Sequence, residues 1–307
     1  MHARFASSRF VYHPPSTVLR QYAIARALFS LPLDEKLKYI SNTAAGDFRG
    51  YKPQSTGSLG TRENGERYNI PKFTPEHERP HPELIREYWD EIQEFSLHIH
   101  YRILLPLLRL FAFVLGIDEE TLVNIHRYEE PGLEYLRYII YHPRSGPEDA
   151  QANNLWAKGH TDYNTLTFLF HQPVAGLQVL SLTGADGNSK SEWRYVRSSP
   201  EAIIVNIADA LEYISGGFLK TDKSRLSLIY FARPEANVLM RPLDSPLLER
   251  VGMALDEEYV RALEGFTAED ELDRKWVKAR IVKDHRFRTG LVDVDERKII
   301  AGVPQQY

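Results

Sequence analysis

The residues best suited to metal chemistry are His160 and Asp162, which stand two apart in the segment GHTDYNTLTFLF. This segment predicts the start of a strand, and side chains two residues apart on a strand point to the same face. An imidazole and a carboxylate placed in this way can occupy neighbouring positions on one divalent metal ion. They supply two of the three ligands of the 2-His-1-carboxylate triad, which leaves positions on Fe(II) open. An H-x-D pair alone is weakly specific, because chance pairs are common.

A second pair, Arg225 and Ser227, lies on one face of the strand predicted by RLSLIYFARP. If that face lines a barrel, the arginine needs an anionic partner, because an unpaired buried cation is costly. The planar fork of Arg225 suits a carboxylate, and Ser227 adds a further donor. A small dicarboxylate, bound to a metal at one end and to Arg225 at the other, would satisfy both pairs. The alternative is that Arg225 faces outward and pairs with a surface acid.

Any such metal must be held by histidine and carboxylate groups, because the chain of 307 residues contains no cysteine. That composition excludes disulfides, iron–sulfur clusters, thiolate zinc sites and cysteine nucleophiles. The net charge of −4 provides no basic footprint for nucleic acid. No uninterrupted apolar run approaches the roughly 20 residues that span a bilayer. We therefore expect a small-molecule substrate, with neither nucleic acid nor a membrane as partner; the oligomeric state is not readable.

The start of the chain is basic and contains no acidic residue before Asp34. This composition is compatible with a transit peptide, but residues 16–31 also fit an ordinary amphipathic helix. The cytoplasm is the expected location.

Helical patterns dominate the first part of the chain. Residues 16–31 predict one helix, and apolar residues at spacings of three and four predict another from Pro82 to Gly116, kinked at Pro106. Between these helices, residues 42–74 are rich in turn-forming residues and predict a long surface excursion.

The period changes from Leu133 onward, where short β-prone runs are separated by turn residues at intervals typical of sandwiches and barrels. A helical pattern returns after Thr267, a predicted N-cap. We interpret the chain as one structural domain in three portions: a helical N-terminal portion at 1–132, a β core at 133–235 and a C-terminal helical extension at 236–307.

The order of motifs GHTDYNTLTFLF, GLQVL, IVNIADALEYISGGFLK and RLSLIYFARP resembles the isopenicillin N synthase-like group of Fe(II)/2-oxoglutarate oxygenases. Upstream, LFSLPLDEKLKY, FRGYKP and RYNIPKF are similar to the helical N-terminal portion of that group. The similarity covers roughly residues 28–300, and several motifs in order are far more specific than any one of them. The resemblance implies a mainly β fold, a double-stranded β-helix or jelly roll, flanked by helices.

The resemblance also implies roles for individual residues. His160 and Asp162 match the family's iron ligands, and Arg225 and Ser227 match the R-x-S pair that holds the distal carboxylate of 2-oxoglutarate. Tyr141 matches a tyrosine that assists there. The implied cofactors are Fe(II), 2-oxoglutarate as cosubstrate and O2, and the implied reaction couples decarboxylation of 2-oxoglutarate to hydroxylation, desaturation or ring closure of a substrate.

One part of the family pattern has no counterpart in this sequence. After GGFLK the family continues into a segment of the type S-T-x-H-R-V, whose histidine is the third iron ligand, but here Lys220 and Arg225 are separated only by TDKS. About a dozen residues, a half-strand and a turn, have no counterpart. The jelly roll is therefore expected to lack part of one core strand, and the start of the chain also departs from the family.

The candidates to replace that histidine are weak. His171 has an odd offset from His160, so on an unbroken strand its side chain points to the opposite face. His142 is adjacent to Tyr141, so its side chain is likewise expected to point away from the pocket. Asp222 is an ordinary turn residue. The remaining histidines considered, outside the barrel motifs, are His126 and His285.

Other residues near the motifs have structural interpretations. Asn206 and Asp209 match family positions, and we expect them to organise a bend between a strand and a turn. Leu166 and Phe168 share the parity of Asp162 and are predicted to line the pocket.

Two hypotheses of function follow. The first is an Fe(II)/2-oxoglutarate oxygenase that oxidises a small molecule of secondary or catabolic metabolism. The alternative is a catalytically impaired relative, a truncated or alternatively spliced product or a decayed copy, that keeps the fold without a complete iron site. The substrate is not readable, because specificity in this architecture resides on loops, here 42–74, 144–158 and the C-terminal helix.

Overall fold

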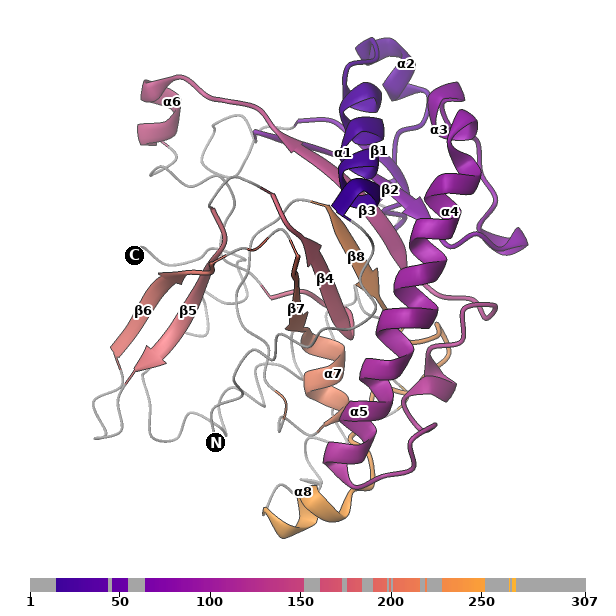
Figure 1. Ribbon diagram of the computed structural model, residues 1–307, viewed down its shortest axis with the longest axis vertical. Helices are drawn as coiled ribbons and strands as arrows, with labels where there is room; N and C mark the ends of the chain where they lie inside the picture. The colour runs from indigo at the N-terminus through magenta and orange to yellow at the C-terminus, as the bar shows by residue number, and fades with distance from the viewer. Residues whose placement is uncertain are drawn as a thin grey trace.

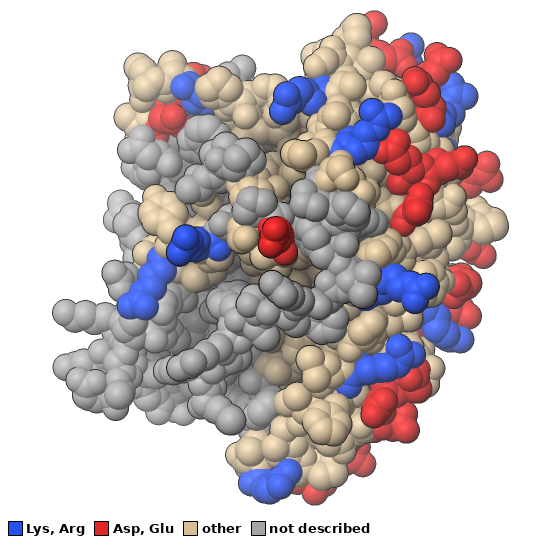
Figure 2. Space-filling view, in the orientation of Figure 1, with Lys and Arg blue, Asp and Glu red and all other residues tan. Residues whose placement is uncertain are grey.

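The computed structural model describes residues 15–43, 46–54, 64–151, 161–172, 176–183, 190–197, 199, 201–215, 219, 228–251, 265 and 267–268. Helices cover one face of an antiparallel sheet, and a separate two-stranded hairpin lies away from that helical layer (Figure 1). Acidic and basic side chains are interspersed over the helical side of the molecule (Figure 2). The expected arrangement, mainly β with flanking helices, is confirmed.

The main sheet has the strand order β1-β2-β3-β8-β4-β7, and its neighbouring strands all pair antiparallel. Its members are β1 (Gly50–Lys52), β2 (Gly65–Pro71), β3 (Tyr135–Tyr141), β4 (Leu166–Phe170), β7 (Ile203–Ile207) and β8 (Ile229–Ala232). The separate hairpin consists of β5 (Gln178–Thr183) and β6 (Lys190–Tyr195). Strand β8 joins the middle of the sheet between β3 and β4, although it is the last of the described strands in chain order.

The two faces of this sheet have different environments. Alternate side chains of β3, β4 and β8 enter a large apolar cluster with the helices; among them are Leu136, Tyr138, Leu166, Phe168, Phe170 and Tyr230. The residues between them form a smaller cluster on the other face: Tyr135, Leu169, Ile229 and Phe231. We call the first the helical face and the second the inner face.

A long helical stretch forms most of the layer on the helical face. It consists of α3 (Glu83–Glu87), α4 (Trp89–His98), a π-helical turn η3 (Ile99–Leu104) and α5 (Leu105–Leu115). Gly116 ends it in a left-handed conformation at φ 70°, as its sequence position predicts. The widened turn comes directly before Pro106, so the proline is accommodated at the start of α5.

Among the described helices, the stretch Trp89–Leu115 alone has the length and apolar composition of a membrane span. One of its faces is occupied by protein, because Ile92, Phe95 and Ile99 are fully buried in the core on the helical face.

Shorter helices complete the described architecture. They are α1 (Pro15–Phe29), α2 (Leu33–Leu37), η2 (Pro75–His77), η4 (Val123–Ile125), α6 (Gly146–Gln151), α7 (Asp209–Ile214) and α8 (Pro246–Arg250). Helix α1 agrees with the predicted helix at 16–31. The helix predicted after Thr267 and the shortened strand before Arg225 lie outside the described residues.

The prediction for residues 42–74 is partly wrong. Strands β1 and β2 come from this stretch and extend the main sheet, with Tyr51 opposite Tyr68 and Asn69 opposite Arg137. The N-terminal portion at 1–132 is therefore not only helical. The pattern of turn-forming residues did not predict these strands. Gly50, Gly65 and Pro71 stand at the strand ends, where a strand tolerates glycine and proline.

Candidate functional site

The candidate site is built around the carboxylate of Asp162, a residue that is 9% exposed. Its Oδ2 atom accepts a hydrogen bond from Thr167 Oγ1 at 2.7 Å and another from Asn206 Nδ2 at 3.1 Å. Thr167 lies on β4 and Asn206 lies opposite it on β7. Two adjacent strands therefore hold the carboxylate in one orientation.

The turn that carries Asp162 is also fixed through its backbone. The Asp209 amide donates to the Asp162 carbonyl at 2.8 Å, and the Thr165 amide donates to the Ala232 carbonyl at 2.8 Å. The side chain of Thr165 is hydrogen-bonded to His126 Nε2 at 2.7 Å. Contacts from β8, α7 and η4 thus place this turn.

The chemistry of Asp162 fits a metal ligand. Carboxylates that bind metals are commonly oriented by hydrogen bonds from neighbouring groups, as Thr167 and Asn206 orient this one. Within the described ranges, no group of three or more histidine, aspartate or glutamate side chains could hold a metal ion. His160, the other predicted ligand, lies outside those ranges, as do Arg225 and Ser227.

Three comparisons bear on this arrangement. Residues 123–234, which include Asp162, Thr167 and Asn206, match the sequence pattern described as the 2OG-Fe(II) oxygenase superfamily. This part of the chain therefore carries the sequence pattern of that superfamily. Its members use Fe(II), 2-oxoglutarate and O2.

The chain is similar to fungal and plant proteins. It is 28% identical over 254 residues to the UPF0676 protein C1494.01 of Schizosaccharomyces pombe, covering 75% of this chain and 74% of that protein. It is 28% identical over 260 residues to leucoanthocyanidin dioxygenase 1 of Oryza sativa subsp. indica, covering 78% of this chain and 66% of the plant protein. The matched part thus spans slightly less than two thirds of the rice protein.

Solved structures share the fold of this chain. A full-length Neurospora crassa protein, determined in complex with alpha-KG, superposes with a TM-score of 0.67 at 19% identity, covering 85% of this chain and 82% of that chain. JOX2 in complex with 2OG, Fe and JA superposes with a TM-score of 0.59 at 22% identity, covering 76% and 68%. These similarities confirm the jelly-roll fold class.

The predicted pocket-lining role of Leu166 and Phe168 is wrong. Both side chains are fully buried in the core on the helical face. The prediction carried the parity of Asp162 into β4, but residues 163–165 form a bend before the strand begins. On β4 the residue that contacts Asp162 is Thr167, which lies between Leu166 and Phe168.

Tyr141, the predicted cosubstrate residue, ends β3 and shares the parity of Tyr135 on the inner face. It is half-buried, and its ring lies over Gly65, where a Cβ atom would come within 3.2 Å of Tyr141 Cε1. Its role beside the cosubstrate stays a prediction, because its proposed partners Arg225 and Ser227 lie outside the described residues.

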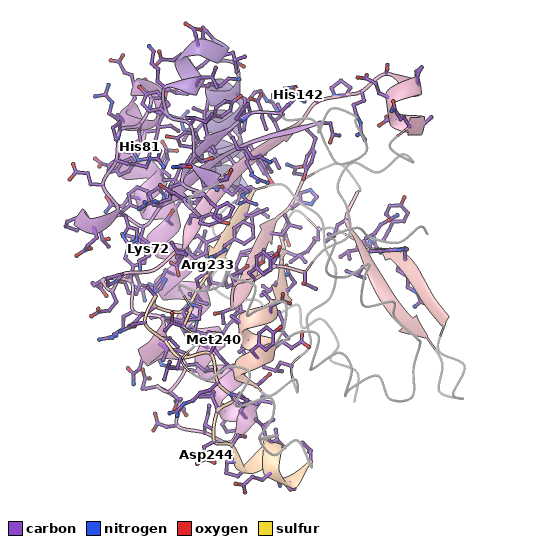
Figure 3. The ribbon with its side chains drawn as sticks, turned by 180° about the vertical axis from the view of Figure 1, so that it is seen from behind. Lys72, His81, His142, Arg233, Met240 and Asp244 are labelled. Atoms are coloured by element: carbon purple, nitrogen blue, oxygen red, sulfur yellow. The ribbon has the colours of Figure 1, made fainter. Side chains whose placement is uncertain are left out.

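His142 is turned away from the inner face, as expected from alternation. Its Nε2 atom contacts Glu66 Oε1 at 2.8 Å, and Glu66 also accepts from Lys36 Nζ at 3.0 Å. The side chain lies where β3 leaves the sheet toward α6 (Figure 3).

His126 is an internal structural group. Burial lowers its pKa to about 4, so the imidazole is neutral near pH 7. Its Nδ1 atom is hydrogen-bonded to the Leu122 carbonyl oxygen, and its Nε2 atom is hydrogen-bonded to Thr165 Oγ1. His171 directly follows β4, whereas Asp222 and His285 lie outside the described residues.

Asn206 was predicted only to organise a bend, and that interpretation is incomplete. The Oδ2 atom of Asp209 accepts a hydrogen bond from Thr161 Oγ1 at 3.1 Å, which joins the start of α7 to the segment before β4. Asn206 in addition donates directly to Asp162. The signal was available, since Asn206 is a buried polar residue between apolar neighbours of a β-strand.

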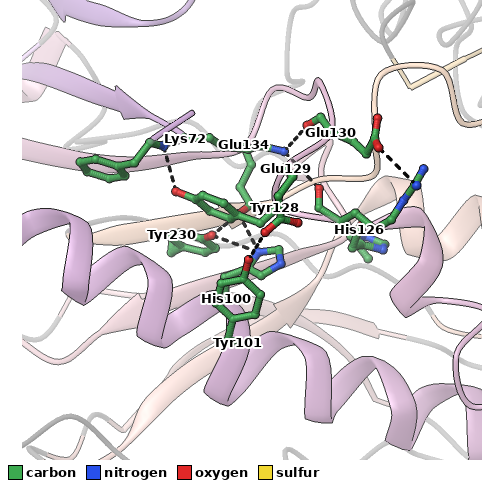
Figure 4. Close-up of polar contacts among 12 residues, drawn as sticks. Lys72, His100, Tyr101, His126, Tyr128, Glu129, Glu130, Glu134 and Tyr230 are labelled. Atoms are coloured by element: carbon green, nitrogen blue, oxygen red, sulfur yellow. Dashed lines mark hydrogen bonds and ion pairs between the residues drawn. The ribbon is translucent and has the colours of Figure 1, made fainter. Parts of the chain in front are cut away.

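A second buried polar cluster lies on the helical face of the sheet, apart from this site (Figure 4). Glu134 accepts from Tyr230 and contacts His100 Nδ1 at 2.9 Å. Burial by itself would raise the pKa of Glu134, but His100, Lys72 and Tyr230 hold it below its ordinary value. This cluster joins η3 to β8 and the segment before β3.

Proposed function

We propose that this chain is an Fe(II)- and 2-oxoglutarate-dependent oxygenase that oxidises a small organic molecule. The observation that carries the proposal is the Asp162 carboxylate, buried and oriented by Thr167 and Asn206 within the segment that matches the superfamily. An orientation fixed by two strands suits a metal ligand, because a ligand must keep its geometry through each turnover.

In this proposal His160 and Asp162 hold the iron, and Arg225, Ser227 and Tyr141 hold the distal carboxylate of 2-oxoglutarate. Iron and 2-oxoglutarate supply the oxidising chemistry. The chain's own residues bind and orient: Thr167 and Asn206 keep the Asp162 carboxylate in place, and the apolar inner face excludes water from the reacting groups.

The proposed substrate is a small molecule of secondary or catabolic metabolism, and the proposed outcome is hydroxylation, desaturation or ring closure. Support comes from the relatives, which include plant leucoanthocyanidin dioxygenases. The Neurospora crassa protein of the same fold was also determined with alpha-KG and thymine.

Succinate formation tests this function. The purified protein is incubated with Fe(II), 2-oxoglutarate and O2, and succinate is measured with each component omitted in turn. We expect slow succinate formation that requires all three components, because members of the superfamily use them together. Asp162→Asn should remove it, and Asp90→Asn, on the exposed side of α4, should retain it. Succinate that still forms when Fe(II) or O2 is omitted would contradict the proposal. Unchanged succinate formation in Asp162→Asn would contradict it as well.

A further inference from the structure

The outward side of α5 exposes large apolar side chains. Leu110 is 49% exposed, Phe113 is 70% exposed and Val114 is 48% exposed. Together with the half-buried Pro106 and Leu107 they recur at spacings of three and four, which places them on one side of the helix. We call these five residues the α5 stripe. The helical stretch that contains α5 runs along the outside of the molecule (Figure 1).

The fold of a single chain does not use the α5 stripe. The contact of α5 with the core is made by Leu108, Ala112 and Leu115, which are fully buried on the opposite side of the helix. A folded domain rarely leaves several large apolar side chains together in water, and such a patch usually marks an interaction surface. The α5 stripe is therefore a candidate docking surface.

Charges of opposite sign lie at the two ends of the α5 stripe. Arg102 is exposed eight residues before Leu110, and three exposed acids follow at eight to ten residues after it: Asp118, Glu119 and Glu120. Within the part of the chain that the structure describes, neither Arg102 nor Glu119 forms an ion pair. The surface is thus basic before the stripe and acidic after it.

The acidic segment after α5 is held in place by its own contacts. Arg109 Nε donates to Glu120 Oε1 at 2.6 Å, and Arg109 Nη2 donates to Glu120 Oε2 at 3.0 Å. The Glu120 amide donates to Asp118 Oδ1 at 2.9 Å. These contacts lie at the surface, so they position the segment without burying Asp118 or Glu119.

A hollow of about 490 Å³ lies at the other end of the α5 stripe. Its lining on α4 and η3 includes Leu97, Tyr101 and Arg102, with Asp90 at the end farthest from the stripe. Arg102 precedes Pro106 by about one helical turn, so the hollow continues the stripe. A molecule that docks on the stripe can extend one of its segments into this hollow.

We infer that a second copy of this chain docks on the α5 stripe, with the two α5 helices antiparallel about a two-fold axis at Leu110. A two-fold contact places each residue against one that lies equally far on the other side of the axis. Leu107 then faces Phe113 of the second copy, and Pro106 faces Val114 of the second copy. Apolar side chains therefore meet apolar side chains along the whole stripe.

The charges decide between the two possible orientations of the second copy. In the antiparallel pair, Arg102 and the hollow face the segment of the second copy that carries Asp118 and Glu119. In a parallel pair, like charges would lie together at both ends, which is unfavourable. The sequence of charge, apolar stripe and opposite charge is complementary to itself only when one copy is reversed.

A second copy fits this surface better than a lipid surface does. The three carboxylates at the end of the stripe would be repelled by anionic headgroups. The inference goes beyond the proposed function and does not depend on it, because the α5 stripe faces away from the sheet that carries Asp162.

The expected dimer is a weak one. Each copy contributes one helix and the turn after it, and interfaces that bury less than about 1,200 Å² in total are commonly transient. We therefore expect a dissociation constant in the micromolar range.

Sedimentation velocity of the purified full chain tests this inference. The mass is followed from about 1 to 200 µM, a range that brackets a micromolar dissociation constant. We expect it to rise from the 35.5 kDa of one chain toward twice that value. Leu110→Glu should weaken the association at least about 30-fold, because each copy brings a charge to the centre of the apolar contact. Leu19→Glu, the same change at a 65% exposed leucine of α1, should leave the association unchanged.

A charge exchange tests the antiparallel orientation. Arg102→Glu should weaken the association, because acidic groups of the two copies then face each other. Adding Glu119→Arg to the same chain should restore most of the lost affinity, since opposite charges meet again. A failure of this rescue, with Arg102→Glu weakened, would overturn the antiparallel arrangement.

Three further results would overturn the inference: a mass of 35.5 kDa at every concentration, an association that persists in Leu110→Glu, or an equal loss in Leu19→Glu. The wild-type titration is decisive even if a variant fails to fold. Flotation with vesicles of phosphatidylcholine and phosphatidylserine is measured in parallel. A wild-type monomer that floats with these vesicles, and no longer does so in Leu110→Glu, would assign the α5 stripe to a lipid surface and not to a second copy.

Discussion

The side-chain amide of Asn206 and the carboxylate of Asp162 are joined by a hydrogen bond of 3.1 Å, from Nδ2 to Oδ2. The two residues are separated by 44 positions in the chain. The bond connects the turn before β4 to the middle of β7, the strand beside it. The orientation of a predicted iron ligand therefore depends on strand pairing in the sheet, and several consequences can be measured.

Removing a hydrogen bond to Asp162 should weaken metal binding. Thr167→Val keeps the shape of the side chain and loses its donor, and Asn206→Ala loses the other donor. We expect each substitution to weaken Fe(II) affinity by about 10- to 100-fold, the usual effect of losing a group that orients a ligand. Competitive metal titration under anaerobic conditions measures this effect.

Asn124→Ala is the matched control for Asn206→Ala, because Asn124 is an exposed residue of η4. Its Fe(II) affinity should equal that of the wild-type protein. Unchanged affinity in both Thr167→Val and Asn206→Ala would mean that these hydrogen bonds serve the fold and not the metal.

The buried Glu134 should contribute to stability in a pH-dependent way. Its pKa in the folded protein is lower than the ordinary value of 4.5, so its charge stabilises the fold fully above about pH 4.5 and less as the pH falls through the folded pKa. Glu134→Gln removes one partner of a buried pair and should cost about 3 kcal/mol at pH 7. Urea unfolding at pH 7 and at lower pH measures the difference, which should shrink in acid.

Glu129→Gln provides the comparison for Glu134→Gln. Glu129 is exposed and accepts a hydrogen bond from Tyr101. An exposed pair of this kind contributes about 1 kcal/mol or less. Equal losses of stability in the two variants would show that the burial of Glu134 is not decisive.

His126 should make the fold sensitive to mild acid. Burial lowers its pKa to about 4 from 6.5, so the unfolded chain binds a proton between these values and the folded chain does not. Stability should therefore fall from pH 6.5 toward pH 4, by up to about 3 kcal/mol from this residue alone. In His126→Gln, urea unfolding across this range should give a flatter pH profile; a profile parallel to that of the wild type would exclude His126 as the source.

Two glycines with similar backbone angles should differ in their tolerance of a side chain. Gly50 has φ 93°, and a Cβ atom there would lie 2.4 Å from the Tyr39 carbonyl oxygen, whereas Gly116 has φ 70° and open space around it. Gly116→Ala should cost about 1 to 2 kcal/mol from the backbone angle alone. Gly50→Ala should cost at least about 2 kcal/mol more, since β1 must shift. Thermal unfolding compares them, and equal losses would contradict the crowding at Gly50.

The sequence was sufficient to predict the features that local patterns encode. The apolar stripe from Ile85 to Ile103 predicted the long helix, and Gly116 its end. The H-x-D motif selected Asp162, which the structure buries and orients. The helix predictions held because periodicity and capping are properties of adjacent residues, whereas the role of Asp162 as an iron ligand stays a prediction.

The predictions that failed depended on where a strand begins or on distant pairing. Leu166 and Phe168 were assigned to the wrong face because the bend after Asp162 resets the alternation. The contact of Asn206 depends on Asp162, 44 positions away in the turn before β4, which no local pattern identifies. A polar residue inside an apolar strand was nevertheless a visible signal at Asn206.

The most direct test of the proposed function is an anaerobic titration of the purified protein with Fe(II) and 2-oxoglutarate, monitored by visible absorption. Chelation of protein-bound iron by the keto acid gives a charge-transfer band. The account predicts a saturable band that is lost in Asp162→Ala and weakened in Arg225→Ala, with Asp90→Ala unchanged. A folded protein that gives no band, or a band that Asp162→Ala retains, would contradict the proposed iron site.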